Sequence, residues 1–246
     1  MHTLLDIHDL SYTYQTPEGE TPALSHISLT VDKGEFIAVV GPSGCGKSTL
    51  LSLISGLLSP SDGTITFHGQ SMGYMLQKDH LFEWCSIYKN ITLGLDIKHR
   101  LNDTSKQAVS EMMDTYGLGS FAKVKPSQLS GGMRQRAALI RTLALEPELL
   151  LLDEPFSALD YQTRLNVCDD IYHIIMQEHK TAILVTHDLA EAISVGDRVI
   201  VLSKRPASIR KNLPISFQME NRTPFASRNE PNFKDYFNEI WEELNV

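Results

Sequence analysis

A glycine-rich loop carries the most informative chemistry of this chain. Gly41 to Thr49 read G-P-S-G-C-G-K-S-T, and this loop directly follows the apolar run Phe36–Val40. The spacing G-x-x-x-x-G-K-[ST] lets backbone N–H groups surround a phosphate chain while the lysine reaches the β- and γ-phosphates. Glycine is needed because the loop approaches the phosphates closely and adopts backbone angles that a Cβ forbids. The loop therefore predicts a nucleoside triphosphate site.

The segment after this loop, Ser48–Leu58, is expected to form a helix whose positive end faces the anion. The Ser48 hydroxyl is expected to bind Mg²⁺. Cys45 is expected to contribute its backbone N–H, and its thiol is assigned no role. The predicted nucleotide contacts in the loop are Gly41, Ser43, Gly44, Cys45, Gly46, Lys47, Ser48 and Thr49.

Two adjacent carboxylates end a second apolar run. Leu149–Leu152 is followed by Asp153 and Glu154. In a phosphate-loop fold, an acid at the end of such a strand holds Mg²⁺, usually through water, which is the role expected of Asp153. Glu154 is placed to orient or deprotonate a water that faces the γ-phosphate. A merely solvated acid pair is the alternative, and the nearby phosphate loop favours the catalytic interpretation.

A second glycine-containing stretch, Leu129–Arg136, reads L-S-G-G-M-R-Q-R. Ser130 is a typical N-cap residue, and the two glycines after it let a ligand lie against the first turn of a helix that runs to about Leu145. On its own, this stretch indicates only a capped helix with an end that suits an anion.

The L-S-G-G-x-x-Q-R pattern, lying between the phosphate loop and the acid pair, resembles the signature motif of ATP-binding-cassette (ABC) ATPases. Almost the whole chain is similar to that family. Gln77 matches the glutamine loop, Asp160 ends the dimer loop Ser157–Asp160, and His187 matches the switch histidine that contacts the γ-phosphate. Tyr14 stands where an aromatic ring stacks on adenine; simple packing on an edge strand is its alternative.

The resemblance implies a mechanism with two copies of the chain, ATP and Mg²⁺. Two cassettes pair head to tail, and the phosphate loop of one copy faces the helix start of the other, so that Ser130, Gly131 and Gly132 bind ATP in trans. It also implies that Gln77 contacts Mg²⁺ and water, as a metal ligand beside Ser48 and Asp153, and that Gln77, Glu154 and His187 are the catalytic residues.

The stretches Gln77–Trp84 and Asn90–Leu95 are similar to the nitrate/sulfonate/taurine importer group, which also includes carriers of thiamine precursors. Glu83 stands where proline is usual, and Lys89 where glutamate is usual. The resemblance implies an importer subunit with transmembrane permease subunits, an extracytoplasmic solute-binding protein, and a place on the cytoplasmic face of the membrane.

Two interpretations of Trp84 remain equal alternatives: packing on the helical lobe and contact with a membrane subunit. A soluble ABC regulator or scaffold is the alternative function, and an exporter is a lesser one.

The elements that must position these residues indicate an α/β phosphate-loop fold. Four continuous apolar runs suit parallel strands buried on both faces, in a core sheet like that of RecA: 36–40, 149–152, 182–185 and 199–202. Alternating residues predict an antiparallel β lobe over about 1–35 and 60–76. Helical periodicity predicts a helical lobe over about 87–145, inserted in an ATPase domain of residues 1–215.

Residues 216–246 form the expected C-terminal extension. Its apolar residues recur at helical spacing, which predicts an amphipathic helix. They are Phe233, Tyr236, Phe237, Ile240, Trp241 and Leu244. Docking of this helix onto its own core is the favoured interpretation, and a dimer or regulatory contact is the alternative.

Composition limits the class of protein. The 246 residues are 42% hydrophobic, enough for a full core, and the net charge of −8 argues against nonspecific nucleic-acid binding. There is no long apolar run and no charged-then-apolar leader, so neither a membrane span nor a secretion signal is expected. Cys45, Cys85 and Cys168 have no disulfide or zinc spacing, which fits a reducing compartment.

Overall fold

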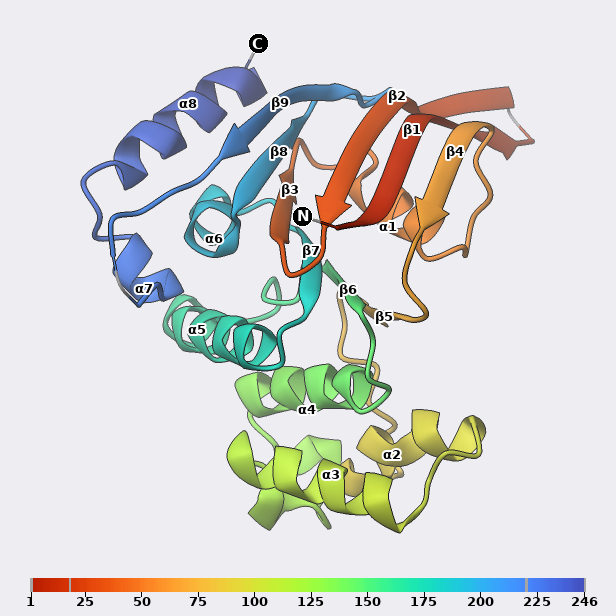
Figure 1. The fold of residues 1–246 in the computed structure, drawn as a ribbon, viewed down its shortest axis with the longest axis vertical. Coiled ribbons are helices and arrows are strands. Elements are labelled where there is room, and N and C mark those ends of the chain that lie inside the picture. Colours follow the sequence, from red (N-terminus) through yellow and green to blue (C-terminus); the bar gives the residue numbers. More distant parts are fainter. Residues whose placement is uncertain (1, 18, 220, 246) are drawn as a thin grey trace.

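The computed structural model describes residues 2–17, 19–219 and 221–245. Figure 1 shows two sheets, helices around them and a helical lobe at one end. The strands are β1 (Thr3–Thr16), β2 (Gly19–Asp32), β3 (Phe36–Val40), β4 (Asp62–Phe67), β5 (Met72–Met75), β6 (Leu149–Asp153), β7 (Thr181–Val185), β8 (Arg198–Leu202) and β9 (Ile209–Pro214). The α-helices are α1 (Lys47–Ile54), α2 (Ile87–Ile97), α3 (Asp103–Thr115), α4 (Gly131–Leu143), α5 (Tyr161–Gln177), α6 (Leu189–Val195), α7 (Pro224–Ser227) and α8 (Phe233–Asn245).

The larger sheet has six strands in the order β5-β6-β7-β3-β8-β9. Its first five strands are parallel, and β9 runs antiparallel to β8 at one edge. The four apolar runs of the sequence are β3, β6, β7 and β8, which confirms the predicted parallel core. They are apolar throughout because both faces of the sheet are covered.

Alternate residues of β3 show what covers each face. Ile37 and Val39 pack with α1 and the smaller sheet, whereas Ala38 and Val40 pack with α6 and α8. At the other end of the sheet, α4 and α5 cover the second face above β6 and β7. Successive strand side chains point to opposite faces, so both layers require apolar residues.

The N-terminal lobe is a three-stranded antiparallel sheet in the order β2-β1-β4, as its alternating residues predict. The predicted extent of its second part, 60–76, needs correction. Met72–Met75 is strand β5, which pairs in parallel with β6 in the core sheet. A Cβ on Gly73 would lie 2.4 Å from Cγ2 of Thr142, so close approach of α4 requires glycine in this strand.

The helical lobe contains α2, α3 and two short 3-10 turns, at Gly119–Phe121 and Pro126–Gln128, with α4 joining it to the core. Asn102 caps α3, as its residue type predicts, because its side chain accepts a hydrogen bond from the Ser105 amide at 3.0 Å. The predicted helix Ser48–Leu58 is shorter than expected. It ends at Ile54 because Gly56 adopts a φ of 77°, which terminates the turn.

The C-terminal helix docks onto the protein's own core. Ile240 is fully buried among residues of α6 and β8, while Trp241 is 55% exposed. Lys211 of β9 forms an ion pair with Glu239 of α8 at 2.7 Å. The favoured sequence interpretation is therefore confirmed for this helix.

The parallel strands β3, β6, β7 and β8 all end at the same edge of the core sheet. Ligand sites form at the carboxyl ends of such strands, where the loops that leave them gather. In the described part of the chain, none of the helices has the length and apolar character needed to cross a bilayer.

Candidate functional site

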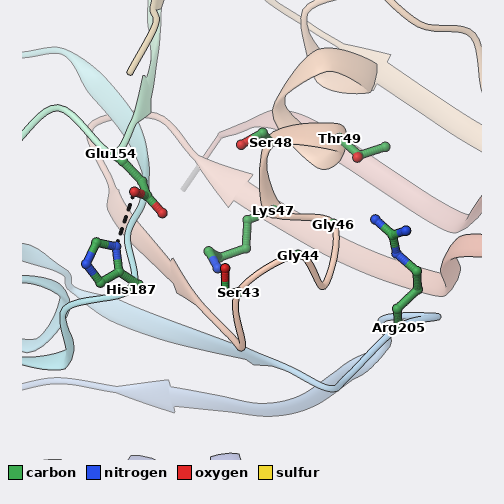
Figure 2. Close-up of a pocket in the computed structure, with 9 residues that line it drawn as sticks. All are labelled: Ser43, Gly44, Gly46, Lys47, Ser48, Thr49, Glu154, His187 and Arg205. Atoms are coloured by element: carbon green, nitrogen blue, oxygen red, sulfur yellow. Dashed lines mark ion pairs between the residues drawn. The ribbon is translucent and has the colours of Figure 1, made fainter. Parts of the chain in front are cut away.

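A cavity of about 420 Å³ lies at the carboxyl edge of the core sheet (Figure 2). The loops after β3, β6, β7 and β8 each contribute residues to its wall. The lining residues are Ser43, Gly44, Gly46, Lys47, Ser48, Thr49, Glu154, His187 and Arg205. The topology thus brings the predicted phosphate loop, base and switch histidine together.

The phosphate loop has the backbone that its glycines predict. Gly44 and Gly46 have φ values of 73° and 126°, which L side chains rarely adopt. A Cβ on Gly46 would also lie 2.9 Å from Cδ2 of Leu24. The Lys47 ammonium donates to the carbonyl oxygens of Gly41 at 2.8 Å and Pro42 at 3.2 Å. The Lys47 ammonium group is thereby held at the loop, where a phosphate chain would pair with it.

Cys45 lies within the loop but its side chain faces the core. Its thiol is buried, and that burial raises its pKa, an effect only partly opposed by the positive charge of Lys47. A buried, protonated thiol has little nucleophilic reactivity. The geometry agrees with a contribution from the backbone alone.

Ser48 and Asp153 form an oxygen-rich pair beside the cavity. The Ser48 hydroxyl donates to Oδ1 of Asp153 at 3.0 Å, and the Tyr74 hydroxyl donates to Oδ2 at 3.4 Å. Desolvation raises the pKa of the Asp153 carboxyl, with the charge of Glu154 adding to the effect. A buried carboxylate next to a hydroxyl is a donor set that suits Mg²⁺. These residues therefore fit the predicted cation.

The His187 ring and the Gln77 side-chain amide both lie next to one carboxylate oxygen of Glu154. Oε2 of Glu154 lies 3.2 Å from Nδ1 of His187 and 3.2 Å from Nε2 of Gln77, although the three residues follow β6, β7 and β5. The Gln77 amide also lies 3.4 Å from Oγ of Ser157. The structure thus joins the three predicted catalytic side chains, with Gln77 next to the base rather than next to Asp153.

The backbone of Glu154 adopts a left-handed conformation, with φ 45°. Such a conformation costs a residue with a Cβ about 1–2 kcal/mol. The Glu154 amide donates to the carbonyl of Val185 at 2.9 Å, which anchors the bend to the neighbouring strand. Non-glycine residues in this region concentrate at active sites, where the surrounding structure compensates their strain.

Tyr14 reaches the far end of the phosphate loop. Its hydroxyl lies 2.9 Å from Oγ1 of Thr49, and its ring packs edge-on against Tyr12 with 4.8 Å between centroids. Thr49 lines the cavity, whereas Tyr14 does not, so stacking of this ring on adenine stays a prediction.

The residues predicted to bind the ATP of a second copy lie away from the cavity. Ser130 caps α4 by accepting from the Met133 amide at 3.3 Å, and none of the residues 130–132 lines the cavity. Ser130 and Gly131 are exposed, whereas a Cβ on Gly132 would lie 2.7 Å from Cγ2 of Val167. Asp160 caps α5, accepting from the Thr163 amide at 3.1 Å. The helix start is therefore open to solvent in a single copy.

Two residues of this region were missed by the sequence reasoning. Arg205 lines the cavity from the loop after β8, and Tyr74 contacts Asp153 from β5. A charged residue soon after a buried parallel strand is the signal that could have identified Arg205, because that strand ends beside the phosphate loop. Tyr74 could not be recognised before the pairing of β5 with β6 was known.

Comparison with known proteins gives a consistent picture. A family model described as "ABC transporter" matches residues 24–157. An uncharacterized ABC transporter ATP-binding protein, YtlC of Bacillus subtilis (strain 168), is 44% identical, over 99% of this chain and 96% of the relative. The nitrate import ATP-binding protein NrtD of Synechocystis sp. is 37% identical, over 96% and 93%. A dimeric, post-hydrolysis structure of the ATP-binding cassette MJ0796, bound to ADP and Pi, matches with a TM-score of 0.74 and 28% identity, over 87% of this chain and 99% of that one.

Proposed function

This chain belongs to the ABC transporter family, and from that premise we propose that it is the ATP-hydrolysing subunit of a membrane importer. The solute is a small organic molecule or oxyanion, of the sulfonate, taurine, nitrate or thiamine-precursor type. The nitrate import relative and the Gln77–Leu95 stretch support that class. The observation that carries the ATPase activity is the meeting of the phosphate loop, Glu154 and His187 in one cavity.

Each side chain has a role in the hydrolysis of ATP. Lys47 pairs with the β- and γ-phosphates, and the amides of the phosphate loop surround them. Glu154 accepts a proton from water as the water oxygen attacks the γ-phosphorus and the bond to the β-phosphate oxygen breaks. Gln77 orients that water, and His187 contacts the γ-phosphate. Tyr14 stacks on the adenine ring.

Ser48 and Asp153 are the residues that would hold Mg²⁺, and Gln77, which contacts Glu154, is the third residue expected to bind it. The ion, when bound, neutralises charge that develops on the phosphates. The Ser48–Asp153 contact of 3.0 Å places the two oxygen donors together without it.

A second copy of the chain completes the site. One copy leaves Ser130 and Gly131 exposed and away from its own cavity, although a capped helix N-terminus with two glycines suits a phosphate. Head-to-tail pairing would place these residues over the γ-phosphate bound by the partner. The dimeric state of the solved cassette supports this arrangement.

The helical lobe offers a contact site for transmembrane permease subunits. A groove of about 350 Å³ lies between α2, α3 and the end of α4, with apolar walls that include Val109 and Met112. Arg100 and Glu146 pair at 2.9 Å at its rim. Its lining is half polar, with His99, Asn102 and Ser105 beside the apolar residues. A permease subunit bound to the helical lobe would hold the chain on the cytoplasmic face of the membrane, with a solute-binding protein outside.

Trp84 is a second candidate for contact with a permease subunit. Its side chain is 74% exposed, and its ring lies 4.9 Å from the Phe82 ring at a tilt of 45°. This exposure supports contact with a membrane subunit rather than packing on the helical lobe. Glu83, the residue that departs from the usual proline, pairs with Arg134 of α4 at 2.7 Å, and Asp79 pairs with the same guanidinium at 2.8 Å. These pairs connect the exposed segment to the helix that begins at Ser130.

The test uses Glu154→Gln, with Glu20→Gln on the exposed hairpin as a matched control. We expect Glu154→Gln to bind ATP and to dimerise. Its rate of ATP hydrolysis should fall by about a hundredfold or more, because the proton acceptor is lost. Size-exclusion chromatography and phosphate release measure the two effects. Unchanged turnover would refute the assigned base. Co-purification of multi-span membrane proteins would support an importer, and their absence would favour a soluble ABC regulator or scaffold.

A further inference from the structure

Arg164, in the first turn of α5, contacts two loops that flank the cavity. Its guanidinium donates to the carbonyl oxygen of Leu159 at 3.0 Å. It also lies 3.5 Å from Oδ2 of Asp188 and 3.8 Å from Oε1 of Glu191. Its side chain is 22% exposed, so water screens these contacts only partly.

The first of these loops is 157–160, which leaves the catalytic base and ends in the cap of α5. The Ser157 hydroxyl donates to the carbonyl of Glu154 at 3.0 Å, and Leu159 is almost buried. A shift of this loop therefore moves both the base and the Leu159 carbonyl.

The second loop carries His187 and is fixed on both sides of that residue. The Thr186 hydroxyl accepts from the Asp188 amide at 3.0 Å and donates to Oε2 of Glu191 at 2.7 Å. Asp188 also caps α6 through the Ala190 amide at 2.8 Å. Both acids that Arg164 faces thus hold the backbone around His187.

We propose that Arg164 is a positioning residue that makes the orientation of His187 depend on the loop 157–160. This inference rests on the proposed function and its head-to-tail pair, and on the resemblance to ABC ATPases, which implies that this dimer loop meets the second copy. Docking of the partner would set the Leu159 carbonyl, and the guanidinium would pass the shift to Asp188 and Glu191.

A positioning role predicts a specific kinetic signature. Arg164 lies outside the cavity wall, so its loss should leave nucleotide affinity unchanged while the reacting groups lose their alignment. Misplacement of catalytic groups by a fraction of an ångström to 1 Å costs about tenfold to a hundredfold in rate.

The experiment compares Arg164→Gln, Arg164→Lys and Glu191→Gln with wild type. ATP affinity, kcat, KM and thermal stability are measured on each. We expect Arg164→Gln to keep the ATP Kd within about twofold and to lose about tenfold or more in kcat, and Arg164→Lys to recover part of that loss. If Arg164→Gln does not fold, a fall in kcat at unchanged affinity in Arg164→Lys or Glu191→Gln supports the proposal.

Arg198→Gln is the matched control. Arg198 pairs with Glu35 far from the cavity, and its side chain is also 22% exposed. Its loss should lower stability while kcat stays within about twofold of wild type. The proposal is overturned if Arg164→Gln and Glu191→Gln keep wild-type kcat, or if Arg198→Gln loses as much kcat as Arg164→Gln. Lys47→Ala tests the proposed function separately from the role of Arg164. Retained hydrolysis in that variant would refute the ATPase site itself.

Discussion

At the scale of single residues, Glu154 owes its position to neighbours that come from three other segments. Its amide is bonded to β7, its carboxylate meets His187, and the amide of Gln77 approaches from the loop after β5. The strained φ of 45° is tolerated because these contacts hold the residue in place. These contacts hold the carboxylate beside His187 and Gln77 at the carboxyl edge of the core sheet.

Glu191 provides a prediction at this scale. Desolvation raises the pKa of its buried carboxyl from 4.5 to about 7, with the charge of Asp188 adding to the effect. The folded state therefore binds more protons than the unfolded state between these pH values. Stability from this group is present at low pH and falls as pH rises through the window, by up to about 1.4 kcal/mol per pH unit.

Glu191→Gln removes that titration. We expect the stability of the variant, relative to wild type, to increase from about pH 4.5 to about pH 7.5, because only the wild type must ionise a buried acid. Denaturant unfolding of both proteins without nucleotide, across this range, measures the difference. A difference that is constant with pH would contradict the assignment.

At the scale of secondary-structure elements, the helices that cover the core sheet are held by apolar contact, and their polar ends carry the function. Helix α4 buries one face against the core and presents Ser130 at its exposed start. Helix α8 has the same amphipathic design without such a terminus, and it covers α6 and β8. We infer that α8 mainly stabilises the sheet edge.

Truncation after Asn232, which removes α8, tests this role. Loss of the buried Ile240 and of its partly buried neighbours should destabilise the protein by about 3 kcal/mol or more. For a chain of this size that corresponds to a fall in Tm of about 10 °C. Trp241→Ala, at an exposed position of the same helix, should change Tm little. Weakened assembly with unchanged Tm would instead identify α8 as an interface.

At the scale of the whole molecule, the functional parts lie in two separated places. The phosphate loop and Glu154 meet at the edge of the core sheet, while the signature segment begins α4 near the helical lobe (Figure 1). Folding of one chain assembles the cavity residues and, separately, the start of α4. Only pairing of two molecules would bring these two places together. A two-fold symmetric pair, in which the phosphate loop of each copy faces the start of α4 of the other, closes with two sites of this kind.

A mixing experiment tests that arrangement. Lys47→Ala disables the phosphate loop, and Gly131→Asp places a negative charge at the exposed helix start, so each variant alone should be inactive. A mixed dimer retains one site with both parts intact, and random pairing should restore about a quarter of wild-type ATPase activity. Phosphate release from the mixture measures this. Activity of Gly131→Asp alone would show that one copy contains a complete site.

Much of this architecture could be predicted because local patterns reflect local physics. Continuous apolar runs identify the buried parallel strands, and the residue type of Ser130 identifies it as a helix cap. The ends of two elements differ from the prediction. The stop of α1 before Gly56 depends on the backbone conformation of that glycine, and the place of Met72–Met75 depends on a strand far along the sequence.

Three motifs could be recognised without the fold: a phosphate loop, an acid pair after a buried strand, and a capped glycine-containing helix start. Such motifs are short, and their spacing follows directly from the geometry of a phosphate or a helix end. The tertiary structure alone decided which distant residues share a site, such as Arg205 at the cavity and Arg164 between two loops. These contacts follow from the order of strands in the sheet, and strand order depends on long-range pairing that no local pattern records.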